Sequence, residues 1–166
     1  MSEAPLCLGG FMAVGKSTVG PILAARLGWS FVDLDLRVAD DTGRSPAEWF
    51  AGAGEGAFRE AELRALGAVL SRPRVVLALG GGTLHRRPAR EAVRAAGAPC
   101  VMLRATWETV APRIQASERP LRHVAAGLYA ERSSAEGRCR APAVWVDGRS
   151  PAAVADAVLE ALRWVA

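Results

Sequence analysis

The feature that most constrains the fold is a glycine-rich segment close to the N-terminus. Residues 10–18 read GFMAVGKST and match the pattern G-x-x-x-x-G-K-[ST]. The apolar run Leu6-Cys7-Leu8 precedes the segment, and a helical pattern continues to about Leu27. Between a strand and a helix, such glycines let several backbone N–H groups point into one concavity beside the positive helix end. The segment therefore predicts a binding site for nucleotide phosphates; the alternative is an ordinary glycine-rich turn with an exposed lysine.

The residue types inside this loop match the chemistry of nucleotide phosphates and their metal ion. Lys16 is the single lysine among the 21 lysine and arginine residues, so the position requires a compact ammonium rather than a guanidinium. A lysine here reaches the β- and γ-phosphates, and the Ser17 hydroxyl can bind Mg²⁺. Pro21 lies within the helix that follows, where it lacks an N–H and crowds the Ser17 carbonyl, at roughly 3 kcal/mol. We therefore expect a kink between Ser17 and Pro21.

The rest of the chain alternates short apolar runs with helical patterns, without an internal repeat or a linker. A length of 166 residues is sufficient for one domain with a buried core. Strands are expected at 6–8, 31–32, 75–79, 101–103 and 144–146. Helices are expected from the glycine-rich loop to about 27, at 54–71, 89–96 and 107–114, and from 151 onward. Residues 37–51 are expected to form two short helices with a break near 42–43. Residues 115–140 are polar and poorly periodic. Five strands alternating with helices predict a doubly wound, five-stranded parallel α/β sheet flanked by helices.

Charge and composition narrow the class of partners. The net charge is +4 and the isoelectric point about 9.6, but the arginines are scattered among acids, with no basic helix. We therefore expect no nucleic-acid partner, and a small anionic substrate explains the same excess. No apolar run approaches the roughly 20 residues that span a bilayer, and the N-terminus lacks a basic leader. The three cysteines show no metal or disulfide spacing, so we expect a cytoplasmic protein without a membrane partner.

Two carboxylates follow the second expected strand. Asp33 and Asp35 stand at positions i and i+2 of a segment expected to be extended, so their side chains would point the same way. The carboxyl ends of strands are where α/β folds place ligands. One carboxylate could hold magnesium through its water ligands, and the other could accept a hydrogen bond from a hydroxyl. The alternative is a strand-to-helix cap in which Asp35 is the N-cap.

Two further segments carry candidate ligand contacts. Arg59 has Glu55 at i−4 and Glu62 at i+3, so two carboxylates can hold its guanidinium in place. An exposed salt-bridge face of a helix is the common alternative. Gly80-Gly81-Gly82 follows the clearest expected strand, and three glycines allow a ligand to lie against backbone N–H donors. A simple flexible turn is the alternative there.

Taken in order, these motifs resemble those of the shikimate kinase family. The matching segments are Gly10–Gly20, Asp33-Leu34-Asp35, Gly54-Glu55 with Phe58-Arg59, Leu79–Gly82 and Arg119-Pro120-Leu121, and they extend over nearly the whole chain. The resemblance implies one domain over 1–166 with a P-loop fold like that of nucleoside monophosphate kinases, a substrate-binding region at about 34–60 and a lid at about 115–128. It also implies ATP-dependent phosphorylation of the 3-hydroxyl of shikimate, in the route to chorismate and aromatic amino acids, with Mg²⁺.

The resemblance further implies a role for individual residues. Lys16, Asp35 and Arg119 would be catalytic. The metal would be bound by Ser17 and, through water, by Asp33. ATP would be bound by Gly10, Ala13, Val14, Gly15, Lys16, Ser17, Thr18, Arg113, Arg119, Arg149 and Pro151. Shikimate would be bound by Asp35, Arg59, Gly80, Gly81, Gly82 and Arg132. Arg59 would clamp the substrate carboxylate, since guanidinium and carboxylate match as a bidentate pair.

The segment after the expected lid departs from the family pattern. The family usually has Arg-x-Pro-Leu-Tyr there, whereas residues 132–140 read RSSAEGRCR. We favour Arg132 as the second arginine of the carboxylate clamp, with Arg138 and Arg140 as rivals. This departure motivates two alternatives, a kinase for another small hydroxylated acid such as gluconate and a non-catalytic nucleotide-binding module. We expect no histidine catalysis from the isolated His85 and His123, and a chain of this size is expected to be a monomer.

Overall fold

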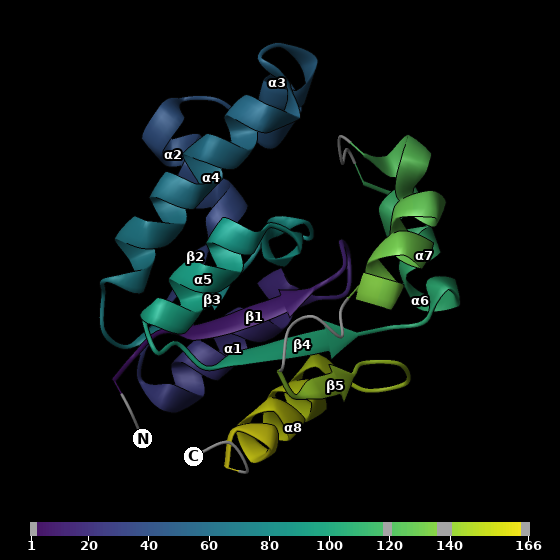
Figure 1. Ribbon diagram of the computed structural model, residues 1–166. Coiled ribbons are helices and arrows are strands. Elements are labelled where there is room, and N and C mark those ends of the chain that lie inside the picture. Colours follow the sequence, from purple (N-terminus) through teal and green to yellow (C-terminus); the bar gives the residue numbers. More distant parts are fainter. Residues whose placement is uncertain (1–2, 118–120, 136–140, 164–166) are drawn as a thin grey trace.

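The computed structural model describes residues 3–117, 121–135 and 141–163. Its centre is a five-stranded, all-parallel sheet with the strand order β2-β3-β1-β4-β5 (Figure 1). The strands are β1 (Leu6–Gly10), β2 (Ser30–Asp33), β3 (Val75–Ala78), β4 (Cys100–Arg104) and β5 (Ala143–Trp145). This arrangement confirms the predicted doubly wound sheet. β1 pairs with β3 on one side and with β4 on the other. The order in which successive strands are added therefore reverses beside β1, and ligands bind at such a switch point.

Helices cover both faces of the sheet. They are α1 (Lys16–Leu27), α2 (Leu34–Thr42), α3 (Pro46–Ala51), α4 (Gly54–Leu70), α5 (Arg87–Ala95), α6 (Trp107–Gln115), α7 (Ala125–Ala135) and α8 (Pro151–Arg163), with short 3₁₀ turns η1 (Thr83–His85) and η2 (Arg122–Val124). In Figure 1, α4 and α5 lie above the sheet, whereas α1 and α8 lie below it. Among the described residues, no helix combines the length and the apolar composition that a membrane crossing demands.

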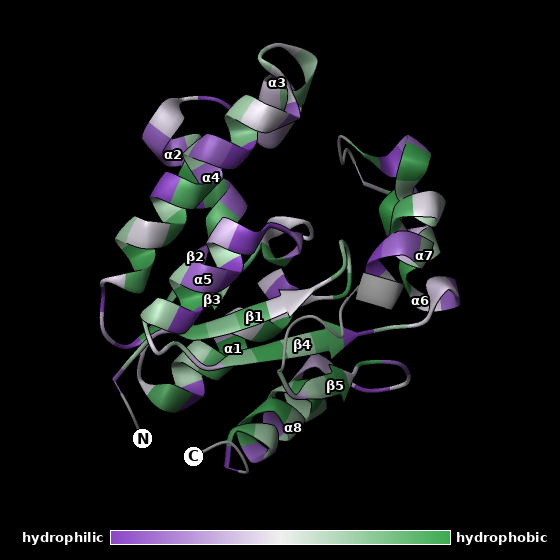
Figure 2. Ribbon diagram, in the orientation of Figure 1, coloured by the Kyte–Doolittle hydropathy of each residue, from purple (hydrophilic) through white to green (hydrophobic). Residues whose placement is uncertain are grey.

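The central strand divides the core into two clusters. Leu6 and Leu8 belong to the cluster that contains α1 and α8 side chains, whereas Cys7 belongs to the cluster with α4 and α5 side chains. Successive side chains of a strand point to opposite faces, so a continuous apolar run buries both faces at once. In Figure 2, β1 and β4 are green over most of their length, while the end of β1 is pale and the end of β4 is purple.

The start of α2 corrects the expectation for the two carboxylates. Asp33 is the N-cap, and its Oδ1 accepts hydrogen bonds from the backbone N–H groups of Asp35 at 3.1 Å and Leu36 at 3.4 Å. Asp35 is therefore not the cap, and it lies in the first helical turn rather than in an extended segment. Both residues are good N-caps by type, so the motif alone did not decide which one begins the helix. The predicted break between two short helices is confirmed at Gly43.

The polar segment 115–140 contains a helix that its weak periodicity did not predict. α7 is held by tertiary contacts: Tyr129 donates a hydrogen bond to the Ala105 carbonyl at 2.8 Å, and its ring packs edge-on against Phe11 with centroids 5.3 Å apart. Ala125 is buried against the same core cluster. Contacts with distant residues, rather than an amphipathic pattern, therefore define this helix.

Pro21 lies in the interior of α1. The helix runs from Lys16 to Leu27 through this residue, so the proline does not end it. The missing N–H still deprives the Ser17 carbonyl of its usual donor four residues later. The kink between Ser17 and Pro21 stays a prediction.

Candidate active site

The glycine-rich segment forms a loop between β1 and α1, as its motif predicts. Gly10 and Gly15 have φ angles of +132° and +112°, which residues with a side chain rarely adopt. The Lys16 side chain is 8% exposed, and its ammonium donates to the carbonyls of Gly10 at 2.7 Å and Phe11 at 2.9 Å. The alternative of a turn with an exposed lysine is therefore wrong. The ammonium lies inside the curve of the loop.

This loop is one wall of a cavity of about 360 Å³. Its lining is Met12, Ala13, Val14, Gly15, Lys16, Ser17, Thr18, Val19, Asp33, Asp35, Leu79, Gly81, Arg113, Val146, Arg149, Pro151 and Val154. The lining thus brings together the loop, the end of β2 and the segment from β5 into α8. The predicted nucleotide contacts that the structure describes are in this wall, except Gly10, whose carbonyl accepts the Lys16 ammonium. Arg119 lies outside the described residues.

Two side chains whose oxygens could hold a metal ion, directly or through water, meet in the wall of this cavity. The Ser17 hydroxyl donates to Asp33 Oδ2 at 2.5 Å, while the other oxygen of Asp33 caps α2. Mg²⁺ in phosphate sites takes one or two such protein oxygens and completes its shell with water and phosphate oxygens. The residues present therefore fit Mg²⁺.

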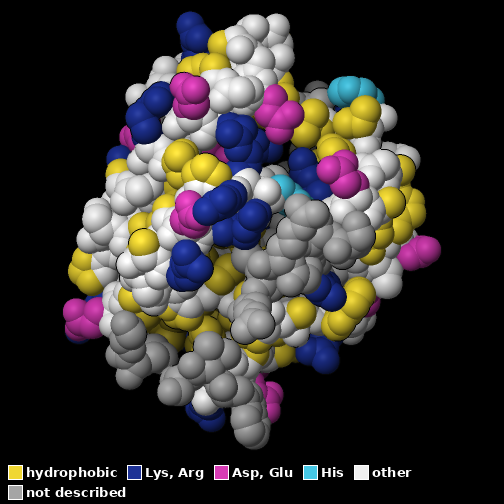
Figure 3. All heavy atoms as spheres, viewed as in Figure 1, with side chains coloured by type: hydrophobic (Ala, Val, Ile, Leu, Met, Phe, Trp, Pro, Cys, Tyr) yellow, Lys and Arg dark blue, Asp and Glu magenta, His cyan; other side chains and the backbone are white. Residues whose placement is uncertain are grey.

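A second cavity of about 80 Å³ adjoins the first. Its lining is Met12, Asp35, Pro46, Phe50, Phe58, Arg59, Gly80, Gly81, Gly82, Leu121 and Arg132. Met12, Asp35 and Gly81 line both cavities. A group bound in the second cavity would therefore approach a phosphate in the first at these three residues. Figure 3 shows Lys and Arg side chains gathered on the face between the α4 and α5 side and α7.

Arg59 is fixed by a network inside the second cavity. Its guanidinium is held by Glu62 at 2.9 Å and Glu55 at 3.2 Å, and Glu62 also accepts the Thr83 hydroxyl at 2.6 Å. Arg59 is 7% exposed and Glu62 is 3% exposed, so an exposed salt-bridge face is ruled out. A Cβ on Gly82 would lie 2.3 Å from Arg59 Nη2, so a side chain at this position would displace the Arg59 guanidinium.

A second guanidinium, from α7, reaches the same place. Arg132 is 8% exposed and lies over the Phe11 ring, with its guanidinium carbon 5.9 Å from the ring centroid. Burial lowers the pKa of Arg132, and the positive charge of Arg59 lowers it further. The same Cβ on Gly82 would lie 3.2 Å from Arg132 Nη2, so both guanidinium groups converge on one glycine. Two buried cations at one cavity form a site for an anion, and the rivals Arg138 and Arg140 lie outside the described residues.

Asp35 is the titratable group at the junction of the two cavities. Burial raises its pKa to about 6, and the nearby carboxylates of Asp33 and Glu62 add to the rise. Lys16 and Arg59 act in the opposite direction. A carboxyl group with a pKa close to neutral can take up a proton near physiological pH.

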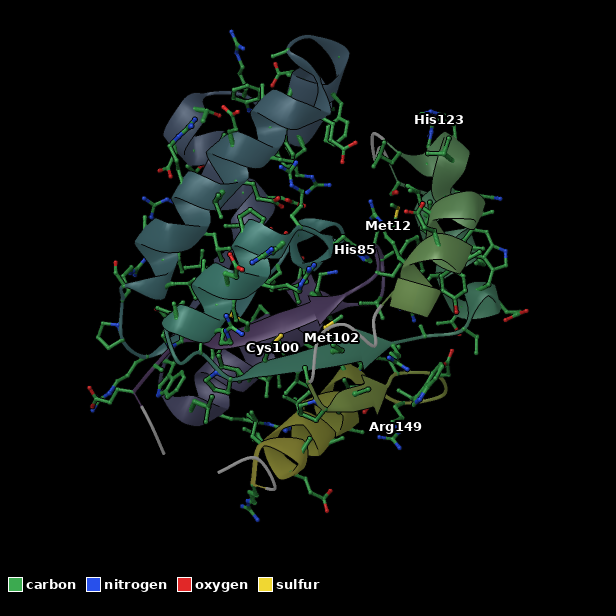
Figure 4. The ribbon with its side chains drawn as sticks, viewed as in Figure 1. Met12, His85, Cys100, Met102, His123 and Arg149 are labelled. Atoms are coloured by element: carbon green, nitrogen blue, oxygen red, sulfur yellow. The ribbon has the colours of Figure 1, made fainter. Side chains whose placement is uncertain are left out.

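The second cavity also has an apolar part that was not predicted from the sequence as a ligand contact. Pro46, Phe50 and Phe58 come from α3 and α4, and the two phenylalanine rings are 5.3 Å apart. All three lie between residues 34 and 60, the region expected to bind substrate, and Phe58 belongs to the matching Phe58-Arg59 segment. In Figure 4, Met12 and His85 lie between the α4 side and α7, whereas His123, in η2, lies at the top of the view, away from the sheet. Burial and the charge of Arg132 lower the pKa of His85.

A family model described as shikimate kinase matches residues 12–163. The chain belongs to the shikimate kinase family. Among curated relatives, the shikimate kinase of Chlorobium chlorochromatii is 45% identical over 69% of this chain and 60% of its own length. That of Paramagnetospirillum magneticum is 44% identical over 70% of this chain and 60% of its own length. The matched part of the chain thus spans about 60% of the length of these relatives.

Solved structures show the same fold over nearly the whole chain. The shikimate kinase from Acinetobacter baumannii in complex with shikimate has a TM-score of 0.86 at 27% identity, with 97% of this chain and 93% of that chain covered. The Aquifex aeolicus shikimate kinase has a TM-score of 0.80 at 28% identity, with 96% of each chain covered. A gluconokinase from Sinorhizobium meliloti shares the fold, with a TM-score of 0.63 at 19% identity and coverage of 100% of this chain and 95% of that chain.

Proposed function

We propose that this chain transfers the γ-phosphoryl group of ATP to the 3-hydroxyl of shikimate, as the resemblance implied. The observation that carries the proposal is that a phosphate-loop cavity and a cavity with two buried arginines share Asp35. Family membership gives the class of reaction, and an arginine pair selects a carboxylate-bearing acceptor. The Acinetobacter baumannii relative was solved with shikimate.

In this proposal the second cavity binds the acceptor. Arg59 and Arg132 pair with the shikimate carboxylate, and the glycines at 80–82 present backbone N–H donors to the ring hydroxyls. Phe50 and Phe58 contact the apolar ring face. The two arginines lie in one wall with Asp35, which supports the placement of an acceptor hydroxyl toward the first cavity.

Asp35 is proposed as the group that receives the hydroxyl proton. The 3-hydroxyl oxygen attacks the γ-phosphorus, the bond to the β-phosphate oxygen breaks, ADP leaves, and the proton passes to the Asp35 carboxylate. Its pKa of about 6 supports this role, since the group is then largely ionised at neutral pH and basic enough to accept a proton. Lys16 neutralises charge on the transferring phosphate, and Arg119 is proposed to do so from the lid.

The nucleotide is proposed to occupy the first cavity. Residues 10–18 hold its phosphates, and Arg113, Arg149 and Pro151 flank the adenine. Mg²⁺ would be held by Ser17 and, through water, by Asp33, and when bound it supplies positive charge to the β- and γ-phosphate oxygens. We propose a monomeric enzyme, as expected for a chain of 166 residues.

We further propose one domain over 1–166, with acceptor-binding residues at about 34–60 and a lid at about 115–128. Pro46, Phe50, Phe58 and Arg59 from the first region and Leu121 from the second line the second cavity, which supports both assignments. Closure of such segments would exclude water from the transferring group. We propose a cytoplasmic location, with ATP and shikimate as the partners.

The deciding experiment is a coupled ADP-release assay with Mg·ATP and each of shikimate, quinate and gluconate. We expect strong stimulation by shikimate and little by the other two acids. A preference for gluconate would mean that the altered 132–140 segment has changed the acceptor. ATP binding without ADP release on any acid would identify a non-catalytic nucleotide-binding module.

A further inference from the structure

Asp147 joins two segments that are far apart in the sequence. It follows β5, and its carboxylate accepts hydrogen bonds from the first turn of α6. Thr106 donates to Oδ1 from its backbone N–H at 3.0 Å and from its hydroxyl at 2.9 Å. Thr109 donates to the same oxygen from its hydroxyl at 2.5 Å. One carboxylate therefore binds three donors on a different element.

These bonds give α6 a cap that its own sequence does not provide. Thr106 is the N-cap residue of α6, and its side chain makes no capping bond. Asp147 is 41 positions away, yet it satisfies the Thr106 N–H and places a negative charge at the positive end of the helix. The hydrogen bond from Thr109, followed by that from the Thr106 backbone, lowers the pKa of Asp147. The carboxylate is thus ionised at neutral pH.

Residues of both joined segments line the first cavity. Arg113 comes from the last turn of α6, and Val146 and Arg149 come from the two sides of Asp147. Figure 4 shows Arg149 beyond the carboxyl end of β5. The Arg149 N–H donates to the Val146 carbonyl at 3.1 Å, so the turn that carries Asp147 has a fixed shape. The position of Arg113 relative to Arg149 therefore depends on the bonds that Asp147 makes.

We propose that Asp147 is a positioning residue for the nucleoside part of the bound nucleotide. It holds α6 and the turn before α8 at the separation that a base and ribose require between Arg113 and Arg149. The phosphates are held by residues 10–18, whereas the hydrogen bonds of Asp147 go to Thr106 and Thr109. The inference rests on the proposed nucleotide-dependent function, and it adds a residue that touches no ligand.

The test compares a nucleotide with a ligand that lacks the nucleoside. Binding of Mg·ATP and of Mg·pyrophosphate to the full chain is measured by calorimetry for the natural protein and for Asp147→Ala. We expect the dissociation constant for ATP to rise about tenfold and that for pyrophosphate to change less than about twofold, because loss of preorganisation affects the part that needs positioning. In the assay, KM for ATP should rise while KM for shikimate stays within about twofold.

Two more variants keep the test decisive. Thr109→Val removes one donor and should weaken ATP binding in part, and its effect should not add to that of Asp147→Ala, since both break the same contact. If Asp147→Ala does not fold, the same comparison of ATP and pyrophosphate binding is made with Thr109→Val. Asp156→Ala is the matched control, because this exposed carboxylate of α8 pairs with Arg26 instead. It should leave the affinity for ATP unchanged.

The inference is overturned by an unchanged affinity for ATP, or by equal losses for ATP and pyrophosphate. Equal losses would mean that Asp147 acts on the phosphate loop, which Arg113 contacts at the Ala13 carbonyl. Binding measurements need no acceptor. A natural protein that binds ATP but fails to release ADP with shikimate would therefore refute the proposed reaction and leave this inference standing.

Discussion

The two cavities are built in different ways. One wall of the first cavity comes from a continuous segment, residues 12–19, that leads from β1 into α1. The second cavity is assembled from α3, α4, the glycines after β3, and α7, which are distant in the sequence. A continuous segment carries its geometry in its own residue types, whereas a dispersed site depends on how the elements pack. Substitutions in the first cavity should therefore change activity and leave the fold intact. Substitutions in the second cavity should change both substrate binding and the stability of the fold.

The largest effect is expected at the continuous segment. Lys16→Ala should lower kcat by about a thousandfold or more, because charge neutralisation carries most of phosphoryl-transfer catalysis. Steady-state ADP release measures the loss, and circular dichroism checks that the fold is retained. Lys16→Arg is the charge-preserving control and should also fail, since the ammonium is enclosed by two carbonyls at 2.7 and 2.9 Å. Full activity of either variant would contradict the proposed role of the Lys16 ammonium in phosphoryl transfer.

Replacing Asp35, which lines both cavities, should lower activity but raise the stability of the fold. Asp35→Asn should lower kcat by about 10²- to 10⁴-fold through loss of the proton acceptor. In the natural protein, kcat/KM should rise with pH through a value near 6, the pKa of the buried carboxyl. A flat profile between pH 5 and pH 7, with chemistry rate-limiting, would exclude Asp35 as the proton acceptor.

The stability effect follows from the same pKa. The folded chain holds a proton on Asp35 up to about pH 6, whereas the unfolded chain releases it near 3.8. This carboxyl therefore destabilises the fold as pH rises between these values, and the penalty is complete above pH 6. Asp35→Asn should raise the free energy of unfolding at pH 7.5 by on the order of 1 to 2 kcal/mol, and by little at pH 4. Urea unfolding at the two pH values gives the comparison.

Substitutions of Arg59 and Arg132 in the second cavity should both weaken shikimate binding, but only the loss of Arg59 should also destabilise the fold. Arg132→Ala and Arg59→Ala should each raise KM for shikimate by about ten- to a hundredfold, with KM for ATP little changed. Arg59→Ala should also lower the free energy of unfolding by roughly 3 kcal/mol, because it leaves Glu62 buried without its partner. The control is Arg37→Ala, which removes an exposed pair with Asp41. Equal losses for both substrates would show a structural Arg59.

The smallest effect is expected at Pro21. Pro21→Ala restores the N–H that the Ser17 carbonyl lacks and should raise the free energy of unfolding by about 1 kcal/mol. Thermal unfolding measures the gain, and Ile22→Ala at the neighbouring position controls for the change in size. A gain would support a kink between Ser17 and Pro21, whereas a loss would show that α1 accommodates the proline without strain.

The sequence predicted the continuous parts of the molecule well. The loop at 10–18 and the apolar runs follow from local rules, and the sheet that they predicted is the one observed. Arg59 was also recognisable, because Glu55 and Glu62 stand at helical spacing on either side of it. Its burial was not, since that depends on α4 packing against the glycines after β3.

What the sequence could not show depends on contacts between distant residues. α7 has a weak pattern of its own and is held by Tyr129 and Phe11 across the chain, so its segment was expected to be irregular. The cap at the start of α2 was assigned to Asp35 as an alternative because both aspartates suit a cap, and only the backbone geometry identifies Asp33. Arg132 was chosen among three arginines by resemblance, and its burial beside Arg59 follows from the placement of α7.

Asp33 has a consequence for how this protein can evolve. One of its oxygens holds the start of α2 and the other receives the Ser17 hydroxyl. A serine or threonine offers a single oxygen, and an asparagine offers one oxygen and a donor in place of the second. Few other residues could meet both demands at once, so drift at this position is restricted. Every substitution of Asp33 therefore alters the start of α2 and the contact with Ser17 together.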